Sequence, residues 1–124
     1  MRRRAFLTGS AAMLASVAEG AAHEAKDATG ELTVMVTRRV QAGKEPEAEA
    51  ILRDLQAATL IKDEGCLRYE WYRASTPQTY ILLERWADPT AAQKHMKSPH
   101  FASAIAKLSP LVLEKPRVVW LTKL

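Results

Sequence analysis

The sequence predicts a single small α+β domain that follows an export signal. A chain of 124 residues has room for one domain. Four segments have the alternation or the β-branched and aromatic content of strands, and the stretches between them have the periodicity and start signals of helices. We expect the domain to occupy residues 31–124, after a signal at residues 1–22 and a flexible lead at residues 23–30.

The first 22 residues have the three parts of an export signal. Three arginines at positions 2–4 precede an uncharged run over residues 5–18, and small residues surround Ala22. Residues 3–7, Arg-Arg-Ala-Phe-Leu, match the twin-arginine pattern. The run is shorter than the ~20 apolar residues that span a bilayer. An amphipathic surface helix fits less well, because no polar stripe recurs at helical spacing. We expect a periplasmic or otherwise exported protein whose mature domain is not inserted in the membrane, with the signal either cleaved or kept as an anchor.

The charge of the chain argues against a nucleic-acid partner. The 18 basic and 14 acidic residues give a net charge of +4. Removal of the signal takes away three arginines and Glu19, which leaves 15 basic and 13 acidic residues. A nucleic-acid-binding domain needs a clustered basic face, and the pair Arg38-Arg39 alone does not make one. One of these two arginines is a candidate contact for an anionic ligand, although a solvated strand end explains both.

The domain begins with a strand and a helix. Residues 31–40 alternate apolar and polar side chains, which is typical of a strand with one buried face. Pro46 suits the first turn of a helix, and Glu64-Gly65 ends that helix. The residues of its predicted apolar face are Ala48, Ile51, Leu52, Leu55, Ala58 and Thr59.

A hairpin, a broken helix and a last strand follow. Residues 67–74 and 79–86 are joined by a short turn, which predicts an antiparallel pair. Asp88-Pro89 has the N-cap and first-turn proline of a helix, and Ser98-Pro99 repeats this signal, so the helix breaks and restarts. Residues 117–122 form the final strand.

The predicted order is β-α-β-β-α-β, which is the ferredoxin-like split βαβ arrangement. Helices can cover only one face of its four-stranded sheet. The other face would carry Met35, Tyr72, Ile81 and Leu83 beside Arg68, Glu70 and Arg85. An exposed apolar patch usually marks an interface, and a second copy of the chain is the economical cover. We therefore expect a homodimer.

The helix-covered face of the hairpin is the candidate ligand site. A turn centred near Pro77 places Tyr69 opposite Glu84. The residues predicted to share this face are Leu67, Tyr69, Trp71, Leu82, Glu84 and Trp86. Such an aromatic surface with one carboxylate and one phenol fits the wall of a pocket for an aromatic small molecule.

Two interpretations of the polar residues remain open. His95 is either a general base that takes a phenolic proton, or a core histidine bonded to Glu84 or to a backbone carbonyl. Glu84 needs a partner if it is buried, and Tyr69, Arg85 or His95 could supply it. The aromatic residues either bind substrate or only fill the core; they are Trp71, Trp86 and Phe101.

The cysteine and the histidines give no metal or redox signature. Cys66 is the only cysteine, so it is either a reactive thiol or a small buried hydrophobe. His95 and His100 are five residues apart, which misses the i, i+4 spacing of two ligands on one helix face, and His23 falls in the lead. We expect no bound metal and no cofactor.

Three short segments in this order resemble the antibiotic biosynthesis monooxygenase family. They are Gly65-Cys66-Leu67-Arg68-Tyr69-Glu70, Glu84-Arg85-Trp86 and His95-Met96-Lys97-Ser98-Pro99-His100-Phe101. The resemblance covers residues 31–124 and implies a dimeric α+β barrel, made when two sheets pack face to face. Some members oxidise phenols or quinols with O2 and no cofactor, one branch degrades haem, and another isomerises a small signalling molecule.

The haem branch does not fit this chain. It uses an asparagine on the first strand and an iron-ligating histidine ten residues beyond the position of His95. This sequence contains no asparagine, and the later position is Ile105, which cannot ligate iron. The resemblance then implies cofactor-independent oxidation of a quinol or another phenolic compound, with His95 and Glu84 as the expected catalytic residues. The expected substrate-binding residues are Tyr69, Trp71, Trp86 and Phe101. The alternative is a non-catalytic dimeric module that binds an aromatic ligand or serves as a scaffold.

Overall fold

The computed structural model describes residues 30–124, so the predicted signal and nearly all of the lead lie outside the described residues. The elements are β1 (Leu32–Arg39), α2 (Glu45–Lys62), β2 (Cys66–Arg73), β3 (Thr79–Trp86), α3 (Pro89–Met96), α4 (Pro99–Leu108), the 3-10 turn η1 (Ser109–Leu111) and β4 (Arg117–Leu121). This order confirms the predicted α+β class, with the second helix divided into α3 and α4 as the two proline signals indicated.

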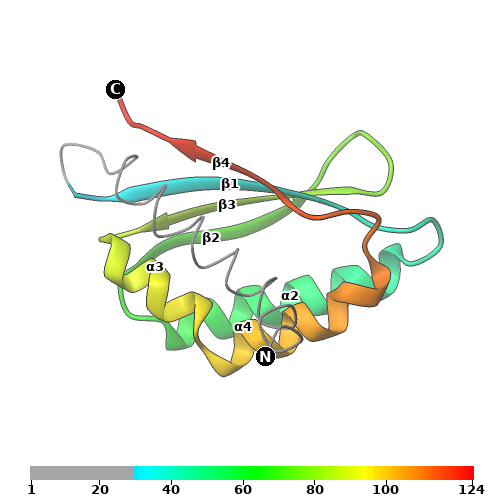
Figure 1. Ribbon diagram of the computed structural model, residues 1–124, viewed down its shortest axis with the longest axis horizontal. Coiled ribbons are helices and arrows are strands. Elements are labelled where there is room, and N and C mark those ends of the chain that lie inside the picture. Colours follow the sequence, from blue (N-terminus) through cyan, green and yellow to red (C-terminus); the bar gives the residue numbers. More distant parts are fainter. Residues whose placement is uncertain (1–29) are drawn as a thin grey trace, which may run out of the picture.

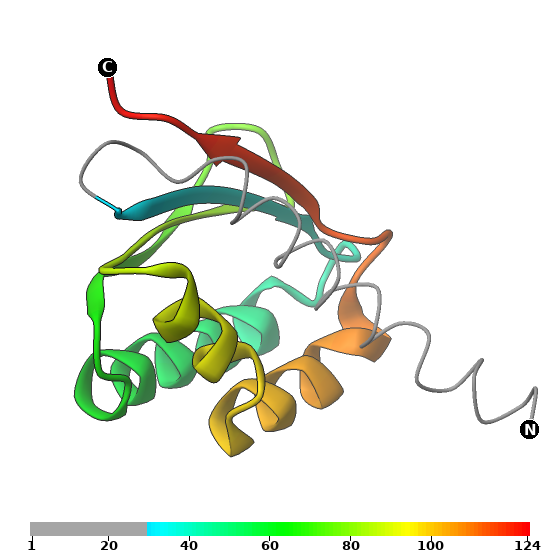
Figure 2. The same ribbon diagram turned by 60° about the vertical axis from the view of Figure 1, so that its left-hand side comes forward.

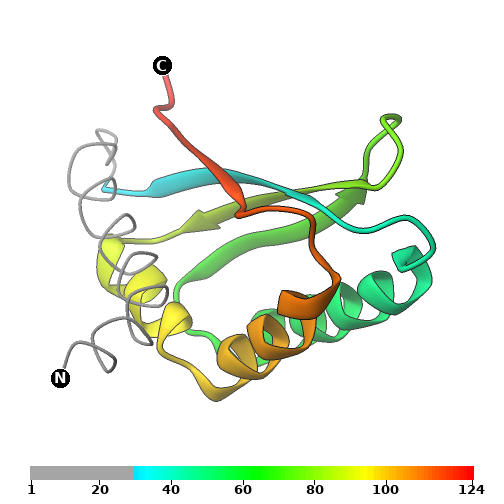
Figure 3. The same ribbon diagram turned by 45° about the vertical axis from the view of Figure 1, so that its right-hand side comes forward.

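The strands form one antiparallel sheet in the order β2-β3-β1-β4. Helices α2, α3 and α4 all lie on one side of it, so the described chain has two layers (Figures 1 and 2). Helix α4 runs beside α2, which it contacts (Figure 3). The chain ends with β4 at the sheet edge beside β1. No helix of the described part combines the length and apolar character needed to cross a membrane.

The alternation of β1 decides which sheet face meets the helices. Leu32, Val34 and Val36 are buried beneath the helices. Their direct partners on β3 are Trp86, Glu84 and Leu82. Because side chains alternate along a strand, every second residue of each strand joins this helix-covered face. The β1 part of the core therefore consists of the apolar residues that the alternating pattern of this strand predicted to be buried.

Helix α2 places Asp63 beside the site described below. The helix starts with Pro46 in its first turn and ends at Lys62, with Asp63 as its C-cap. Gly65 follows with φ +82°, a left-handed conformation that glycine adopts without strain. The buried side chains of the helix are Ala48, Leu52, Leu55 and Thr59. All four belong to the predicted apolar face.

The hairpin register is confirmed at its centre and corrected at one end. Tyr69 pairs with Glu84 and Trp71 with Leu82, as the turn position predicted. The prediction for Leu67 was wrong, because the register shifts between Cys66 and Arg68. This bulge leaves Leu67 46% exposed, and Cys66 packs against the core instead.

The break between α3 and α4 depends on two capped helix starts. The Asp88 carboxylate accepts a hydrogen bond from the Ala91 backbone N–H at 2.8 Å. The Ser98 hydroxyl accepts one from the Phe101 N–H at 3.3 Å and donates to the His95 carbonyl at 2.6 Å. The second start turns the chain so that His95 and His100 lie on different helices.

The opposite sheet face, which we call the open face, carries an apolar row across the strands. Within residues 30–124 no helix lies on this side (Figure 1). Strand pairing aligns Glu70, Leu83, Met35 and Val119 in one row. Tyr72, Ile81, Arg68 and Arg85 flank that row, so the predicted residues of this face share it. A second copy of the chain as its cover stays a prediction.

Candidate active site

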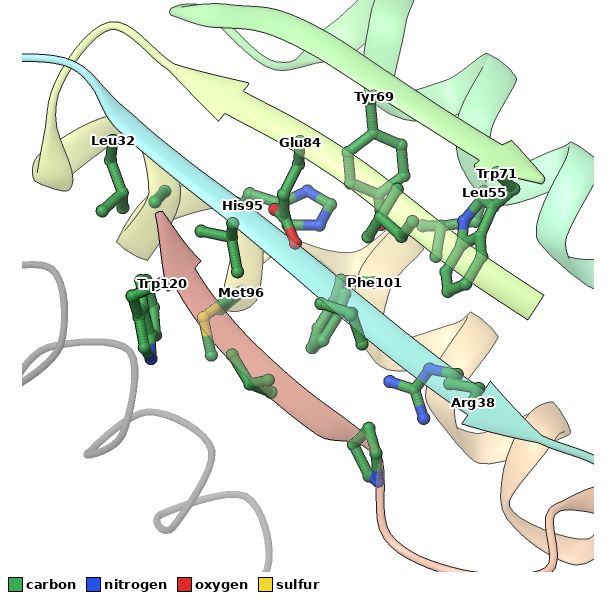
Figure 4. Close-up of a pocket in the computed structure, with 16 residues that line it drawn as sticks. Leu32, Arg38, Leu55, Tyr69, Trp71, Glu84, His95, Met96, Phe101 and Trp120 are labelled. Carbon is green, nitrogen blue, oxygen red and sulfur yellow. The ribbon is translucent and has the colours of Figure 1, made fainter. Parts of the chain in front are cut away.

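A cavity of about 70 Å³ lies between the helix-covered face and the helices. This is room for several water molecules at ~10–15 Å³ each. The wall is mainly apolar, with Leu55 from α2, Met96 from α3 and Phe101 from α4. Its charged, titratable or indole-bearing side chains are Arg38, Tyr69, Trp71, Glu84, His95 and Trp120 (Figure 4). A concave apolar wall with few polar groups is typical of a small-molecule site.

His95 is held by Asp63, a residue that sequence reasoning missed. His95 Nδ1 lies 2.6 Å from Asp63 Oδ2. The Nδ1–H therefore donates to the carboxylate, which leaves Nε2 as the unprotonated acceptor. The prediction of Glu84 or a backbone carbonyl as the partner was wrong. Asp63 is 32 residues away in the chain, and no spacing signal in the sequence links the two.

The free nitrogen of His95 is poised to accept a proton. Nε2 is buried and has no hydrogen-bond partner among residues 30–124. Burial lowers the pKa of His95, against the opposing effect of the Asp63 hydrogen bond. The imidazole is therefore neutral at pH 7, with its lone pair on Nε2. A buried acceptor left without a donor is uncommon in native proteins and needs an explanation.

Aromatic rings surround His95 and fix its plane. The centroid distances from the His95 ring are 4.9 Å to Trp86, 5.0 Å to Phe101 and 5.1 Å to Tyr69. Tyr69 and Phe101 also line the cavity. Trp86 is fully buried and lies outside the cavity wall, so it positions His95 instead of facing a ligand.

Glu84 is the acidic member of the site. Its Oε1 accepts a hydrogen bond from Trp86 Nε1 at 2.7 Å. The predicted partners Tyr69, Arg85 and His95 were therefore wrong, and Arg85 lies on the open face with Glu31 at 3.1 Å. Glu84 lines the cavity, and burial raises its pKa from 4.5 to about 7, against the effects of the Trp86 bond and the Arg38 charge. The carboxyl exchanges a proton near neutral pH.

His100 completes a group with Asp63 and His95. Its Nε2 lies 3.0 Å from the Asp63 carboxylate and 3.2 Å from the Ser98 hydroxyl. The ligand atoms of Asp63, His95 and His100 all lie within 4.8 Å of one another, so they are a possible metal-binding group. The five-residue spacing of His95 and His100 excludes two metal ligands on one helix face, but the two histidines lie on different helices. The helix break and Asp63 bring the two imidazoles together.

The cysteine has the environment of a buried hydrophobe. Cys66 is partly buried against the core, and this burial raises the pKa of its thiol to about 11. The thiolate is the nucleophile, so a thiol with this pKa is unreactive at neutral pH. Of the two interpretations of Cys66, the structure supports the structural one.

The fold and the site together define a ferredoxin-like α+β domain that encloses a small-molecule cavity with a base and an acid in its wall. Residues 31–107 match the sequence pattern of the family described as antibiotic biosynthesis monooxygenase. The chain belongs to this family. The match covers most of the site, from β1 through Glu84, His95 and Phe101, and ends before Trp120. Family membership supports a monooxygenase-like function and small-molecule binding.

Similar proteins agree with this assignment. A candidate antibiotic biosynthesis monooxygenase from Caulobacter crescentus has a TM-score of 0.73 and 30% identity, covering 77% of this chain and 92% of that one. The candidate monooxygenase Rv0793 of Mycobacterium tuberculosis is 28% identical over 82 residues, which are 64% of this chain and 81% of that protein. A conserved protein from Methanosarcina mazei has a TM-score of 0.72 and 26% identity, covering 77% and 95% of the two chains.

Proposed function

We propose that the protein is a cofactor-independent monooxygenase that oxidises a quinol or another phenolic compound with O2. The observation that carries this proposal is the Nε2 atom of His95, which is buried at the cavity, unprotonated and without a partner. A phenolic O–H that enters the cavity can donate to this atom. The fixed tautomer and the neutral state of the imidazole at pH 7 are the two properties that a general base needs.

The reaction begins with transfer of the phenolic proton to His95. The resulting imidazolium is stabilised by Asp63, whose carboxylate already accepts the Nδ1–H at 2.6 Å. Asp63 is therefore a positioning residue for the base. The phenolate left in the apolar cavity is electron-rich and poorly solvated, which favours electron transfer to O2. Glu84, with its pKa raised to about 7, can return or receive the second proton.

The overall change balances without another reductant. One oxygen atom of O2 is inserted at a ring carbon of the quinol, and the product is the hydroxyquinone. The other oxygen atom leaves as water, with two hydrogens taken from the quinol. The ring supplies all four electrons that reduce O2. A flavin or a metal is not required by this balance.

The test is oxygen uptake with a panel of hydroquinones, wild type against His95→Ala. We expect the variant to lose most of the activity, because general-base catalysis contributes roughly 10²–10⁴-fold in rate. The matched control is His100→Ala, which removes the other imidazole bonded to Asp63 but leaves His95 Nδ1 and Nε2 as they are. This control should keep the activity. Incorporation of one ¹⁸O atom from ¹⁸O2 into the product distinguishes a monooxygenase from an oxidase that releases peroxide.

The fold of His95→Ala should survive, since Asp63 retains His100 as a partner. Melting temperatures of both variants check this point. A chelator in the assay should leave the rate unchanged if Asp63, His95 and His100 act through hydrogen bonds and not through an ion. Unchanged turnover in folded His95→Ala protein would contradict the role of His95 as the base. A wild type that consumes no oxygen with any hydroquinone would contradict the proposal and leave a non-catalytic binding module of the same fold.

A further inference from the structure

A partly buried cation that forms no ion pair in the described chain lies at one end of the cavity. Arg38 lines the cavity wall, and its Nε atom is buried with no hydrogen-bond partner. None of the ion pairs among residues 30–124 includes Arg38. Figure 4 shows its guanidinium turned back toward the cavity from the end of β1, opposite the end marked by Leu32. Burying an unpaired charge is costly, so such a group normally has an anionic partner.

A second arginine in the same row of the sheet shows what pairing looks like in this fold. Arg38 and Arg73 both pair with Tyr80, on either side of β3. Arg73 donates two hydrogen bonds to Glu49 of α2, each of 2.7 Å, and the Tyr80 hydroxyl donates a third at 2.6 Å. The Glu49 carboxylate therefore accepts hydrogen bonds from both Arg73 and Tyr80 and pairs the Arg73 charge. No carboxylate takes the corresponding place beside Arg38.

No polar group in the described part of the cavity wall accepts a hydrogen bond from Arg38 Nε. Glu84 is the acid whose charge acts on it, but this carboxyl accepts from Trp86 and has a pKa of about 7. Below that pH it is mostly protonated. The indole Nε1 of Trp71 also lines the cavity, buried and without an acceptor. Two N–H donors of the cavity wall, one of them cationic, thus have no acceptor in the described chain.

We propose that the substrate of this site is a phenolic ring that bears a carboxylate, bound by Arg38 and the Trp71 N–H. The guanidinium matches a carboxylate with parallel N–H donors, and charge-assisted bonds of this kind are about twice as strong as neutral ones. His95 lines the same cavity, and its ring centroid is 5.1 Å from that of Tyr69, which is two residues before Trp71 on the same face of β2. With the carboxylate at Arg38 and Trp71, the phenolic oxygen at the other end of the ring would lie at His95. This inference deepens the proposed function, and it rests on that function only for the phenolic group.

The test compares two ligands of nearly equal shape, the anion 2,5-dihydroxybenzoate and its neutral amide 2,5-dihydroxybenzamide, in which an NH2 group replaces one carboxylate oxygen. Binding is measured by calorimetry without oxygen at pH 6.5, where Glu84 is mostly protonated. We expect the wild type to bind the acid at least about tenfold more tightly than the amide, as the loss of one charge-assisted hydrogen bond implies. Arg38→Gln should bind both ligands about equally, and Arg38→Lys, which keeps the charge, should retain part of the preference.

Arg39→Gln is the matched control. Arg39 is the next residue in the chain, but it is exposed and pairs with Glu114 at 3.3 Å. This variant should keep the full preference for the acid. Equal binding of acid and amide by the wild type, or an undiminished preference in folded Arg38→Gln protein, would overturn the inference.

The failure of this inference and that of the proposed function look different. Oxygen uptake with neutral hydroquinone but without an Arg38-dependent preference would remove the carboxylate and leave the oxidation. A preference that depends on Arg38 in a protein that consumes no oxygen with either ring would leave the anion site and remove the oxidation.

Discussion

Glu84 and His95 share one cavity, and burial acts on them in opposite directions. It raises the pKa of the Glu84 carboxyl to about 7 and lowers the pKa of the His95 imidazole, so both groups are shifted toward their neutral forms. Burial penalises the charged form of either group. The result is a carboxyl that titrates near neutral pH and a neutral imidazole in the wall of one cavity, a combination suited to moving protons.

The shift at Glu84 makes the stability of the protein depend on pH. In the folded state the group binds a proton up to about pH 7, whereas the unfolded chain loses it near 4.5. The folded state therefore binds more protons between these values, and stability falls as the pH rises through this window. His95 acts in the opposite sense, because its lowered pKa makes stability fall as the pH drops below 6.5. A curve of wild-type stability against pH therefore contains both effects and cannot separate them.

Glu84→Gln should separate them. Glutamine keeps the shape and the acceptor for Trp86 Nε1, but it has no charge to bury. The difference in unfolding free energy between the variant and the wild type should grow in favour of the variant by roughly 2 kcal/mol from pH 5 to pH 8, as the pKa shift of Glu84 implies. Urea unfolding of both proteins at the two pH values measures this difference, in which the His95 contribution cancels. Parallel pH profiles would mean that Glu84 titrates normally.

At the scale of the elements, the turn after α2 has to fit closely under α3. Gly65 and Gly43 both have positive φ, +82° and +87°. A Cβ atom on Gly65 would lie 2.7 Å from the Ala91 Cβ of α3, whereas nothing lies within 4 Å of one on Gly43. Contact between these two backbone-fixed carbon atoms can be relieved only by moving the helix.

The two glycines make a matched pair of variants. Gly43→Ala and Gly65→Ala should both lose about 1–2 kcal/mol of unfolding free energy to the left-handed backbone. Gly65→Ala should lose clearly more, because the added methyl group also collides with Ala91. Thermal or urea unfolding gives both values. Equal losses would show that α3 shifts away from the turn at little cost.

The sequence could predict the elements because local signals agree with the global fold. The alternation of β1 decides the burial of Leu32, Val34 and Val36, and the side chains of Asp88 and Ser98 cap helices where the prolines indicated. The register of the hairpin followed from the turn. The exception was Leu67, since a bulge inserts one residue and reverses the face without leaving a sequence pattern.

The site was less predictable, because its partners come from distant parts of the chain. The candidate residues do meet at one cavity, with Trp86 behind its wall. Asp63 could not be foreseen as the partner of His95, since only the packing of α2 beside α4 and the helix break bring them together. Arg38 and Arg39 look equivalent in the sequence, and strand alternation separates them into a partly buried side chain at the cavity and an exposed one.

At the scale of the whole molecule, we predict that the open face makes the protein a dimer. Leu83 and Met35 lie at the centre of this face, and burial of each large apolar side chain contributes on the order of 1.5–3 kcal/mol. Sedimentation at micromolar concentration should give a dimer for the wild type and a monomer for Leu83→Glu. Ile61→Glu is the control, because Ile61 is 82% exposed on α2, and it should remain dimeric. A stable wild-type monomer would refute the prediction.

We also propose export by the twin-arginine route. The double variant Arg3→Lys and Arg4→Lys should remain in the cytoplasm, because the pair is what the route recognises. The control Arg2→Lys keeps the pair and should be exported. Cell fractionation checks both, and sequencing of the exported wild type should find an N-terminus within a few residues of His23. Normal export of the double variant would indicate the general secretory route instead.

Because β4 is the last described element in the chain, its part of the cavity wall is synthesised last. Pro116, Val118 and Trp120 belong to the cavity wall, yet they follow every other described element in the chain. Synthesis from the N-terminus therefore completes the helices, the hairpin and β1 before this part of the wall exists. Until β4 pairs, β1 is a bare sheet edge, open to pairing with other chains. Pairing of β4 covers this edge and completes the cavity wall.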